Sequence, residues 1–157
     1  QILDDTLLGF HLEPFTRTSK RRATQTRKFY YFDCGVSNAL LGRKLAPKTP
    51  EFGKVFEQFL VLETIYASFY DRAVDRVQFW RSSSGLEVDL LINEHTAVEF
   101  KSGRVHESDG RGIMALGEEI TLKNRWIVSR EELPRKLRGG IEVLPWQDYL
   151  QRLSTLG

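Results

Sequence analysis

Residues 87–93 have the sequence Glu-Val-Asp-Leu-Leu-Ile-Asn, and residues 96–102 have the sequence Thr-Ala-Val-Glu-Phe-Lys-Ser. Both runs are short and rich in apolar and β-branched residues, which is typical of buried strands. The polar pair Glu94-His95 between them is short enough to form a hairpin turn. The two runs therefore predict an antiparallel pair of central strands, around which the rest of the chain is arranged.

Charged residues interrupt both apolar runs. Because alternate residues of a strand share a face, Glu99 and Lys101 are expected on the same face of their strand. In the preceding strand, Val88 and Leu90 are expected on one face and Asp89 on the other. The hairpin should therefore bring Asp89, Glu99 and Lys101 to one patch. Charges on apolar strands are costly to bury unless they are paired or bound to an ion.

Such a patch suits metal-assisted hydrolysis of a phosphodiester. Asp89 and Glu99 would bind Mg²⁺ (or Mn²⁺) through oxygen and leave the ion several waters. The ion would polarise a phosphoryl oxygen and lower the pKa of an attacking water, and Lys101 would stabilise developing charge or orient that water. The alternative is a structural charge cluster, because a Glu-x-Lys pair is usually a cross-strand or surface ion pair worth about 0–1 kcal/mol.

A long helix is predicted before these strands. Residues 51–72 contain no proline and no glycine except Gly53, and their apolar residues recur at helical spacing. An acid on this helix could complete the coordination of the metal. Glu57 lies near the helix start, from which it could reach a sheet edge, whereas Glu63 falls within the apolar face. Both alternatives stay open, and we prefer Glu57.

The remaining apolar runs extend the sheet. Further strands are expected over residues 75–81, 125–129 and 141–144, and helices over residues 114–122 and from near Pro145 to Leu153. Helices that alternate with strands in this order predict an α/β fold with a mixed sheet and a helix on at least one face.

The N-terminal part is expected to be a hairpin. Residues 1–15 resemble the tail of a helix that runs into a short strand ending at Pro14, and residues 28–33 are aromatic-rich and predict a second strand. Such a hairpin cannot bury its own apolar side. It should therefore pack on the domain that follows it or on an upstream domain.

A boundary is expected after the hairpin. Residues 34–41 predict a short helix that Gly42 ends, and residues 43–51 contain two prolines and predict a linker. We therefore divide the chain into an N-terminal region, residues 1–42, and a main domain, residues 43–157.

The predicted hairpin loop is basic. Between Thr16 and Lys28 the chain carries several lysines and arginines and no acid. Such a run is usually a solvated, mobile loop, but it could also contact phosphates by releasing their counterions, with Arg21 and Arg22 at its centre. Arg81 and Arg104 flank the proposed metal site, and either could contact a phosphate backbone.

Composition excludes several classes of protein. The 157 residues are 41% hydrophobic and 28% charged, which is typical of one globular domain and not of a disordered chain. The single cysteine, Cys34, excludes a disulfide framework and a cysteine-rich zinc site, so a cytoplasmic location is expected. No apolar run approaches the roughly 20 residues of a membrane helix. The net charge of +2 predicts no strong field for nucleic acid.

Several motifs together resemble a known superfamily. The series Gly53-x-x-x-Glu57, Ser84-Gly85, Val88-Asp89 and Glu99-Phe100-Lys101 is similar to the PD-(D/E)XK nucleases, and its order is close to that of archaeal Holliday-junction resolvases. By this resemblance, Asp89 and Glu99 would be metal ligands, Lys101 the charge stabiliser and Glu57 the helix acid.

A narrower resemblance covers nearly the whole chain. Residues 31–36 (Tyr-Phe-Asp-Cys-Gly-Val), 53–57 (Gly-Lys-Val-Phe-Glu), 85–89 (Gly-Leu-Glu-Val-Asp) and 143–146 (Val-Leu-Pro-Trp) resemble the C-terminal domain of many bacterial and archaeal AAA-type ATPases, known as domain of unknown function 4143. In that family an ATPase domain and a winged helix precede this region. The resemblance implies that the basic hairpin is the end of the winged helix.

The expected fold is therefore a restriction-endonuclease-like core, a mixed sheet flanked by helices, with a winged-helix remnant hairpin before it. The chain has no Gly-x-x-x-x-Gly-Lys-Ser/Thr motif, so this fragment is not expected to hydrolyse ATP. The expected function is that of a Mg²⁺-dependent nuclease domain acting on DNA within a larger ATPase. The alternative is a non-catalytic module of the same fold that binds DNA or protein and regulates the ATPase.

Overall fold

The two central strands lie where the sequence predicts them. A computed structural model describes residues 8–42, 46, 49–70 and 72–156. In it, β4 (Glu87–Ile92) and β5 (Thr96–Lys101) pair antiparallel, with Leu90 opposite Val98. Both strands are buried over most of their length and form the middle of the sheet.

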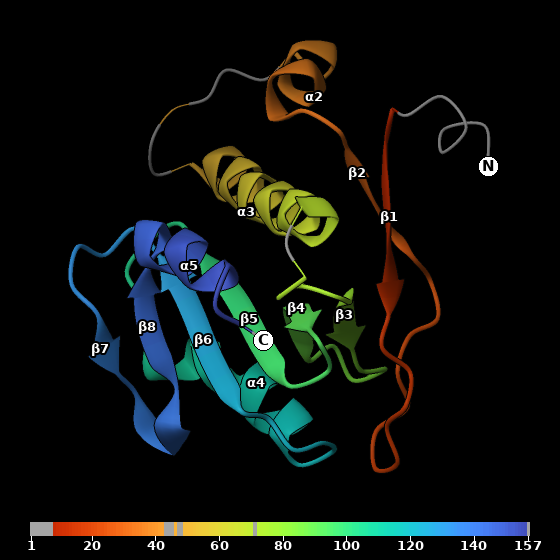
Figure 1. The fold of residues 1–157 in the computed structure, drawn as a ribbon, viewed down its shortest axis with the longest axis vertical. Coiled ribbons are helices and arrows are strands. Elements are labelled where there is room, and N and C mark those ends of the chain that lie inside the picture. The colour runs from red at the N-terminus through yellow and green to blue at the C-terminus, as the bar shows by residue number, and fades with distance from the viewer. Residues whose placement is uncertain (1–7, 43–45, 47–48, 71, 157) are drawn as a thin grey trace.

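The sheet is mixed and, over the described residues, has eight strands in the order β2-β1-β3-β4-β5-β6-β8-β7 (Figure 1). The other strands are β1 (Gly9–Pro14), β2 (Lys28–Tyr31), β3 (Val77–Arg81), β6 (Asn124–Ser129), β7 (Arg135–Lys136) and β8 (Glu142–Pro145). The pairs β1–β3, β5–β6 and β6–β8 are parallel, and the pairs β3–β4 and β4–β5 between them are antiparallel. The predicted α/β fold with a mixed sheet is confirmed.

Helices cover both faces of this sheet. The helices are α2 (Cys34–Leu40), α3 (Pro50–Tyr70), α4 (Arg111–Gly117) and α5 (Trp146–Leu153), with 3₁₀ turns at Glu107–Gly110 and Arg138–Gly140. Figure 1 shows α3 and α5 on one face and α4 behind the sheet. No helix among the described residues combines the length and apolar character needed to cross a membrane.

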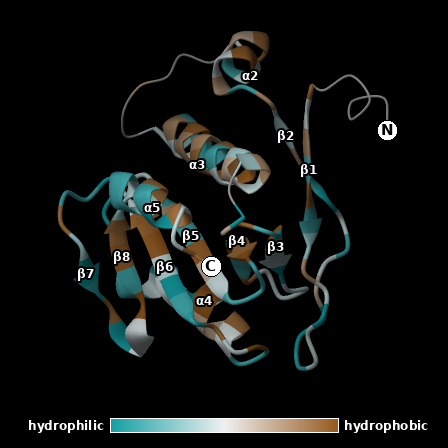
Figure 2. Ribbon diagram, in the orientation of Figure 1, coloured by the Kyte–Doolittle hydropathy of each residue, from teal (hydrophilic) through white to brown (hydrophobic). Residues whose placement is uncertain are grey.

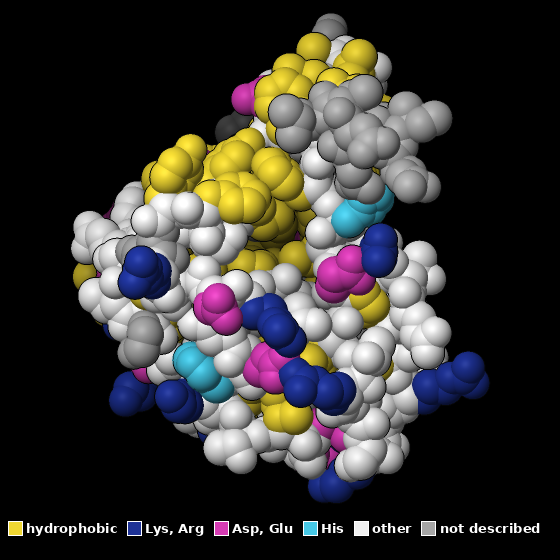
Figure 3. Space-filling model, turned by 45° about the vertical axis from the view of Figure 1, so that its right-hand side comes forward, with side chains coloured by type: hydrophobic (Ala, Val, Ile, Leu, Met, Phe, Trp, Pro, Cys, Tyr) yellow, Lys and Arg dark blue, Asp and Glu magenta, His cyan; other side chains and the backbone are white. Residues whose placement is uncertain are grey.

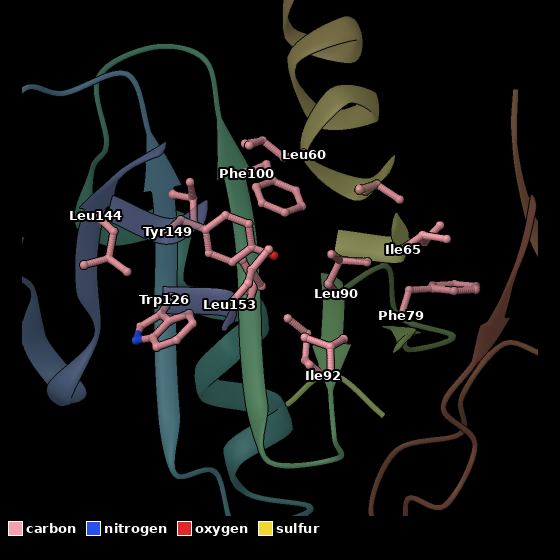
Figure 4. Packing of buried hydrophobic residues seen from close by; sticks show 14 of the residues in the cluster. Leu60, Ile65, Phe79, Leu90, Ile92, Phe100, Trp126, Leu144, Tyr149 and Leu153 are labelled. Atoms are coloured by element: carbon pink, nitrogen blue, oxygen red, sulfur yellow. The ribbon is translucent and has the colours of Figure 1, made fainter. Parts of the chain in front are cut away.

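Two apolar cores separate the layers. The larger lies between the sheet and the helices α3 and α5, where Leu60, Phe100 and Tyr149 pack together (Figure 4). The rings of Phe100 and Tyr149 meet edge to face at 5.7 Å, and the Tyr149 hydroxyl shares a 2.6 Å hydrogen bond with Thr64. The smaller core lies between the sheet and α4. Apolar residues therefore concentrate on the central strands, and hydrophilic residues in the loops (Figure 2).

The N-terminal hairpin is part of the same sheet. β1 pairs antiparallel with β2 and parallel with β3, where Glu13 lies opposite Gln78. Of the two packing partners expected for the hairpin, the following domain is the one observed. The sheet therefore runs without interruption across the predicted boundary between residues 1–42 and 43–157. The helix tail expected within residues 1–7 lies outside the described residues.

Two elements differ from the sequence prediction. The helix expected over residues 114–122 is α4, which begins at Arg111 and ends at Gly117. Leu122 lies after the helix but packs into the same smaller core as the apolar residues of α4. The spacing of Leu122 from those residues therefore resembled the spacing within a helix. Strand β7 was not predicted, because its two residues, Arg135 and Lys136, are exposed and show no apolar alternation.

A close approach between α4 and β4 requires glycine. A Cβ at Gly112 would overlap the backbone carbonyl oxygen of Glu87. We expect Gly112→Ala to destabilise the fold by about 1–3 kcal/mol, because neither the strand nor the helix can yield without losing its packing. The measurement is urea unfolding.

Gly117→Ala is the matched control, since the nearest atom to its added Cβ is 3.5 Å away and the change lies at the other end of the same helix. It should be neutral or stabilise by up to about 1 kcal/mol. Equal stability of both variants would contradict the close approach of α4 to β4.

Candidate functional site

An irregularity in β4 positions Asp89. The register between β3 and β4 shifts, so that Trp80 pairs with Val88 whereas Gln78 pairs with Leu91. Because the strand carries one extra residue at this bulge, the alternation of its side chains is broken. Val88 packs in the core beneath α4 and Leu90 in the core beneath α3. The expectation that these two residues share a face is therefore wrong.

Asp89 occupies the place where β4 and β5 separate. The backbone pairing of the two strands extends to Leu90 and Val98. Beyond it, Oδ2 of Asp89 accepts a hydrogen bond of 2.8 Å from the backbone N–H of Phe100. A side-chain carboxylate thus replaces the backbone carbonyl that a regular ladder would supply, which holds Asp89 buried beside Glu99.

Glu99 and Lys101 project from the end of β5. Nζ of Lys101 donates a hydrogen bond of 2.9 Å to Oε1 of Glu99. The second carboxylate oxygen of Glu99, Oε2, is buried and has no hydrogen-bond partner among the described residues. An unpartnered carboxylate oxygen in a buried position favours a cation as its missing ligand.

Of the two helix acids, the structure brings Glu57 to the site. Its negative charge contributes to raising the pKa values of both Asp89 and Glu99. Glu63 instead lies near Cys34 and Tyr66, whose pKa values its charge helps to raise.

Electrostatics within the carboxylate cluster are unfavourable. Burial raises the pKa of Asp89 well above its usual range, and the charges of Glu99 and Glu57 raise it further. Burial also raises the pKa of Glu99, and its partner Lys101 offsets only part of that effect. The two carboxyl groups are therefore difficult to ionise together unless a cation joins them.

The N-terminal hairpin adds residues to the site that the sequence analysis missed. From β2, the hydroxyl of Tyr30 donates a hydrogen bond of 3.1 Å to Oε1 of Glu57. Nζ of Lys28 lies 2.5 Å from Oε1 of Glu87 and 3.9 Å from Oε1 of Glu57. Lys28 was one cation among many in the basic run, and its place depends on the packing of β1 against β3, so no local pattern marked it.

The four predicted phosphate-contacting arginines are in different surroundings. Arg21 is paired with Glu118 at 2.6 Å and with Glu119 at 3.3 Å, so it fastens the hairpin loop to the end of α4. Arg81 donates to Oε2 of Glu87, whose other oxygen contacts Lys28.

The remaining two arginines are exposed. Arg22 has no side-chain hydrogen bond or ion pair within the described part of the chain, and it lines a cavity that Arg81 also lines. Arg104 lies in the loop after β5. The pKa of the nearby Glu131 is lowered to about 2, mainly by the hydrogen bond from Arg135, and the charge of Arg104 contributes to this effect. The structure therefore joins Arg81 to the carboxylate cluster through Glu87, and places Arg21 elsewhere.

The donor set fits a hard divalent ion with few protein ligands. Asp89 and Glu99 supply carboxylate oxygens, one of them unpartnered. Within residues 8–42, 46, 49–70 and 72–156, no group of three or more His, Cys, Asp or Glu side chains is arranged to hold a metal ion. Mg²⁺ commonly binds through one or two carboxylates and keeps waters or substrate phosphates as its other ligands, so two carboxylates suffice.

Comparison with known proteins identifies one family. Residues 52–149 match the family model described as domain of unknown function (DUF4143). The matched segment contains Glu57, Asp89, Glu99 and Lys101, and it leaves out Lys28 and Tyr30. No curated protein and no solved structure matches the chain.

The raised pKa of Asp89 makes stability depend on pH. The folded state keeps the Asp89 proton to higher pH than the unfolded state, so the contribution of Asp89 to the free energy of unfolding falls as pH rises above about 4, the usual aspartate pKa. We expect Asp89→Asn in EDTA to be more stable than the native chain at pH 8 by at least about 1 kcal/mol, and by less at pH 5.

The amide oxygen of the variant can still accept the Phe100 hydrogen bond, so the comparison isolates charge. Asp75→Asn is the control, because Asp75 is exposed, and it should leave the pH dependence as it is. Urea unfolding at both pH values measures the difference. A variant less stable than the native chain at pH 8 would contradict the repulsion between the carboxylates.

Proposed function

The chain belongs to the DUF4143 family, and we propose that it is a metal-dependent nuclease domain acting on DNA phosphodiesters. The pair of carboxylates formed by the buried Asp89 and the half-buried Glu99 carries this proposal. Both carboxyl groups have raised pKa values, and one oxygen of Glu99 has no partner among the described residues. A divalent cation would remove both penalties at once, and divalent cations activate phosphodiesters toward water.

In this proposal Asp89 and Glu99 hold Mg²⁺ or Mn²⁺, with Glu57 close enough to add negative charge. The bound ion would supply Lewis-acid activation of a phosphoryl oxygen and of an attacking water. The Asp89–Phe100 hydrogen bond fixes the orientation of one ligand, and the Lys101–Glu99 hydrogen bond that of the other. Positioned ligands of this kind lower the cost of assembling the reaction geometry.

Lys101 is the charge stabiliser in the proposed mechanism. Burial disfavours its charged form, but the charge and hydrogen bond of Glu99 outweigh burial, and the pKa of Lys101 is raised. It is therefore an ammonium at neutral pH and acts as a donor rather than as a general base. Its Nζ would donate to the phosphate oxygen on which negative charge develops.

The motif order supports the same assignment. A helix acid, Asp89 and Glu99-x-Lys101 occur in the order that resembles the PD-(D/E)XK nucleases, and the mixed sheet flanked by helices is compatible with a restriction-endonuclease-like core. By the resemblance to AAA-type ATPases, the hairpin would end a winged helix, and the domain would serve an upstream ATPase in the cytoplasm.

A second function has an observation of its own. The chain neutralises part of its acidic cluster internally, since Lys101 pairs with Glu99 and Lys28 pairs with Glu87. Such pairing would let the fold persist without a metal. It favours, as the alternative, a non-catalytic module that binds DNA or protein and regulates the ATPase.

Calorimetric titration with Mn²⁺ and with Mg²⁺ tests the proposal. We expect the native chain to bind Mn²⁺, and Asp89→Asn to bind it at least tenfold more weakly, because one of two charged ligands is lost. Asp75→Asn, with the same change of charge on an exposed side chain, should bind as the native chain does.

Lys101→Ala separates metal binding from chemistry. It should retain Mn²⁺ binding and lose about 100-fold or more of the cleavage of duplex or branched DNA, since the ammonium acts on developing charge. The regulatory alternative is supported instead if the native chain binds neither metal at millimolar concentration, alone or with DNA present.

A further inference from the structure

The hairpin loop and the turn between β3 and β4 line an open surface cavity of about 480 Å³. Arg22 and Thr24 line it from the loop, and Arg81 and Ser83 line it from the strand end and the turn. These two segments are far apart in the sequence. They meet here because β1 lies beside β3 in the sheet.

Backbone hydrogen bonds hold the walls of this cavity in place. The N–H of Ser83 donates to the carbonyl of Arg22 at 2.8 Å, and the N–H of Thr24 donates to the carbonyl of Arg81 at 2.8 Å. Ala23 and Ser82 form an antiparallel bridge between these two bonds. The backbone positions of both arginines are therefore set by the fold.

The chemistry of the lining favours an anion. Arg22 makes no side-chain hydrogen bond or ion pair with any described residue, and Arg81 uses only Nε and Nη2 on Glu87. Among the described residues, no carboxylate lines the cavity, while Ser83 and Thr24 add hydroxyls. Two guanidinium groups with neighbouring hydroxyls suit the charge and the hydrogen-bond acceptors of a phosphate.

The cavity is also connected to the carboxylate cluster. Arg81 contacts Glu87, and Glu87 precedes Asp89 by two residues on β4, a separation of about 7 Å at roughly 3.3 Å per residue. Nucleotides of one DNA strand rise by about 3.4 Å each along the helix axis. One strand could therefore occupy the cavity and the carboxylate cluster with phosphates only a few nucleotides apart.

We propose that this cavity binds a phosphate of a DNA strand that has another phosphodiester, a few nucleotides away, at Asp89 and Glu99. The placement of a phosphodiester at Asp89 and Glu99 rests on the nuclease function proposed above. Arg22 and Arg81 line the cavity and would bind the strand, whereas Arg21 does not line it and is paired with Glu118 and Glu119. Basic and acidic side chains alternate over the lower part of the face in Figure 3, so the cavity and not the whole face would select the strand.

Fluorescence anisotropy in EDTA tests the cavity without any cleavage. The probe is a fluorescein-labelled 20-nucleotide DNA, measured as a single strand and as a duplex over a range of salt. We expect Arg22→Gln to weaken binding about tenfold at low salt. It should lower the slope of log K against log salt by about 0.7 for the single strand or about 0.9 for the duplex.

Two further variants make the test specific. Ser83→Asp places a carboxylate at an exposed position of the lining and should weaken binding at least as much. Arg27→Gln removes the same charge from the same hairpin, but Arg27 is exposed and paired with Glu13, so binding should change less than twofold. Thermal unfolding of each variant verifies that the fold is retained.

The outcomes separate this proposal from the nuclease proposal. Equal weakening by Arg22→Gln and Arg27→Gln would overturn the cavity as a site, because it would show only general charge attraction. Absence of DNA binding by the native chain in EDTA would also overturn it. Arg22-dependent binding in a chain that binds no metal would support the cavity and count against the nuclease function.

Discussion

The hydrogen bond from the Phe100 backbone to the Asp89 carboxylate is the contact on which the arrangement of the site depends. It forms because β4 carries an extra residue and its backbone pairing with β5, which covers Leu90 to Ile92, does not include Asp89. A regular ladder would point Asp89 to one face and keep the strands together. The bulge instead buries a carboxylate at the point where the strands separate, next to Glu99, and transfers Val88 to the core beneath α4.

Burying these carboxylates demands compensation, and the surrounding layers supply it. Lys101 comes from β5 itself, whereas Lys28 comes from the hairpin and contacts Glu87. Glu57, which comes from α3, adds negative charge to the cluster, so these lysines offset a third acid as well. The hairpin is therefore a wall of the candidate site as well as an extension of the sheet. The hairpin residues Lys28 and Tyr30 lie outside residues 52–149, the segment that matches the family. One site therefore combines residues of the matched segment with residues of the hairpin.

The site and the neighbouring cavity share one chain of contacts. Arg81 lines the cavity and donates a hydrogen bond to Glu87. Glu87 also pairs with Lys28, whose Nζ lies 3.9 Å from Oε1 of Glu57. An anion that binds Arg81 would compete with Glu87 for the guanidinium, and the charge of Glu87 contributes to the raised pKa of Glu99. In the proposed function, phosphate binding at Arg81 would therefore be linked to the ionisation of the carboxylate cluster through this series of contacting side chains.

The sequence by itself determined the strands β4 and β5, the long helix α3 and the pairing of Glu99 with Lys101, because strand and helix periodicity and i, i+2 neighbours are local properties. The tertiary structure decided which helix acid reaches the cluster, since the packing of α3 on the sheet selects Glu57 over Glu63. It also decided the places of Lys28 and Tyr30, which depend on the pairing of β1 with β3 across about 65 residues of sequence. Contacts between distant elements follow register and packing, and no local pattern in the chain specifies either.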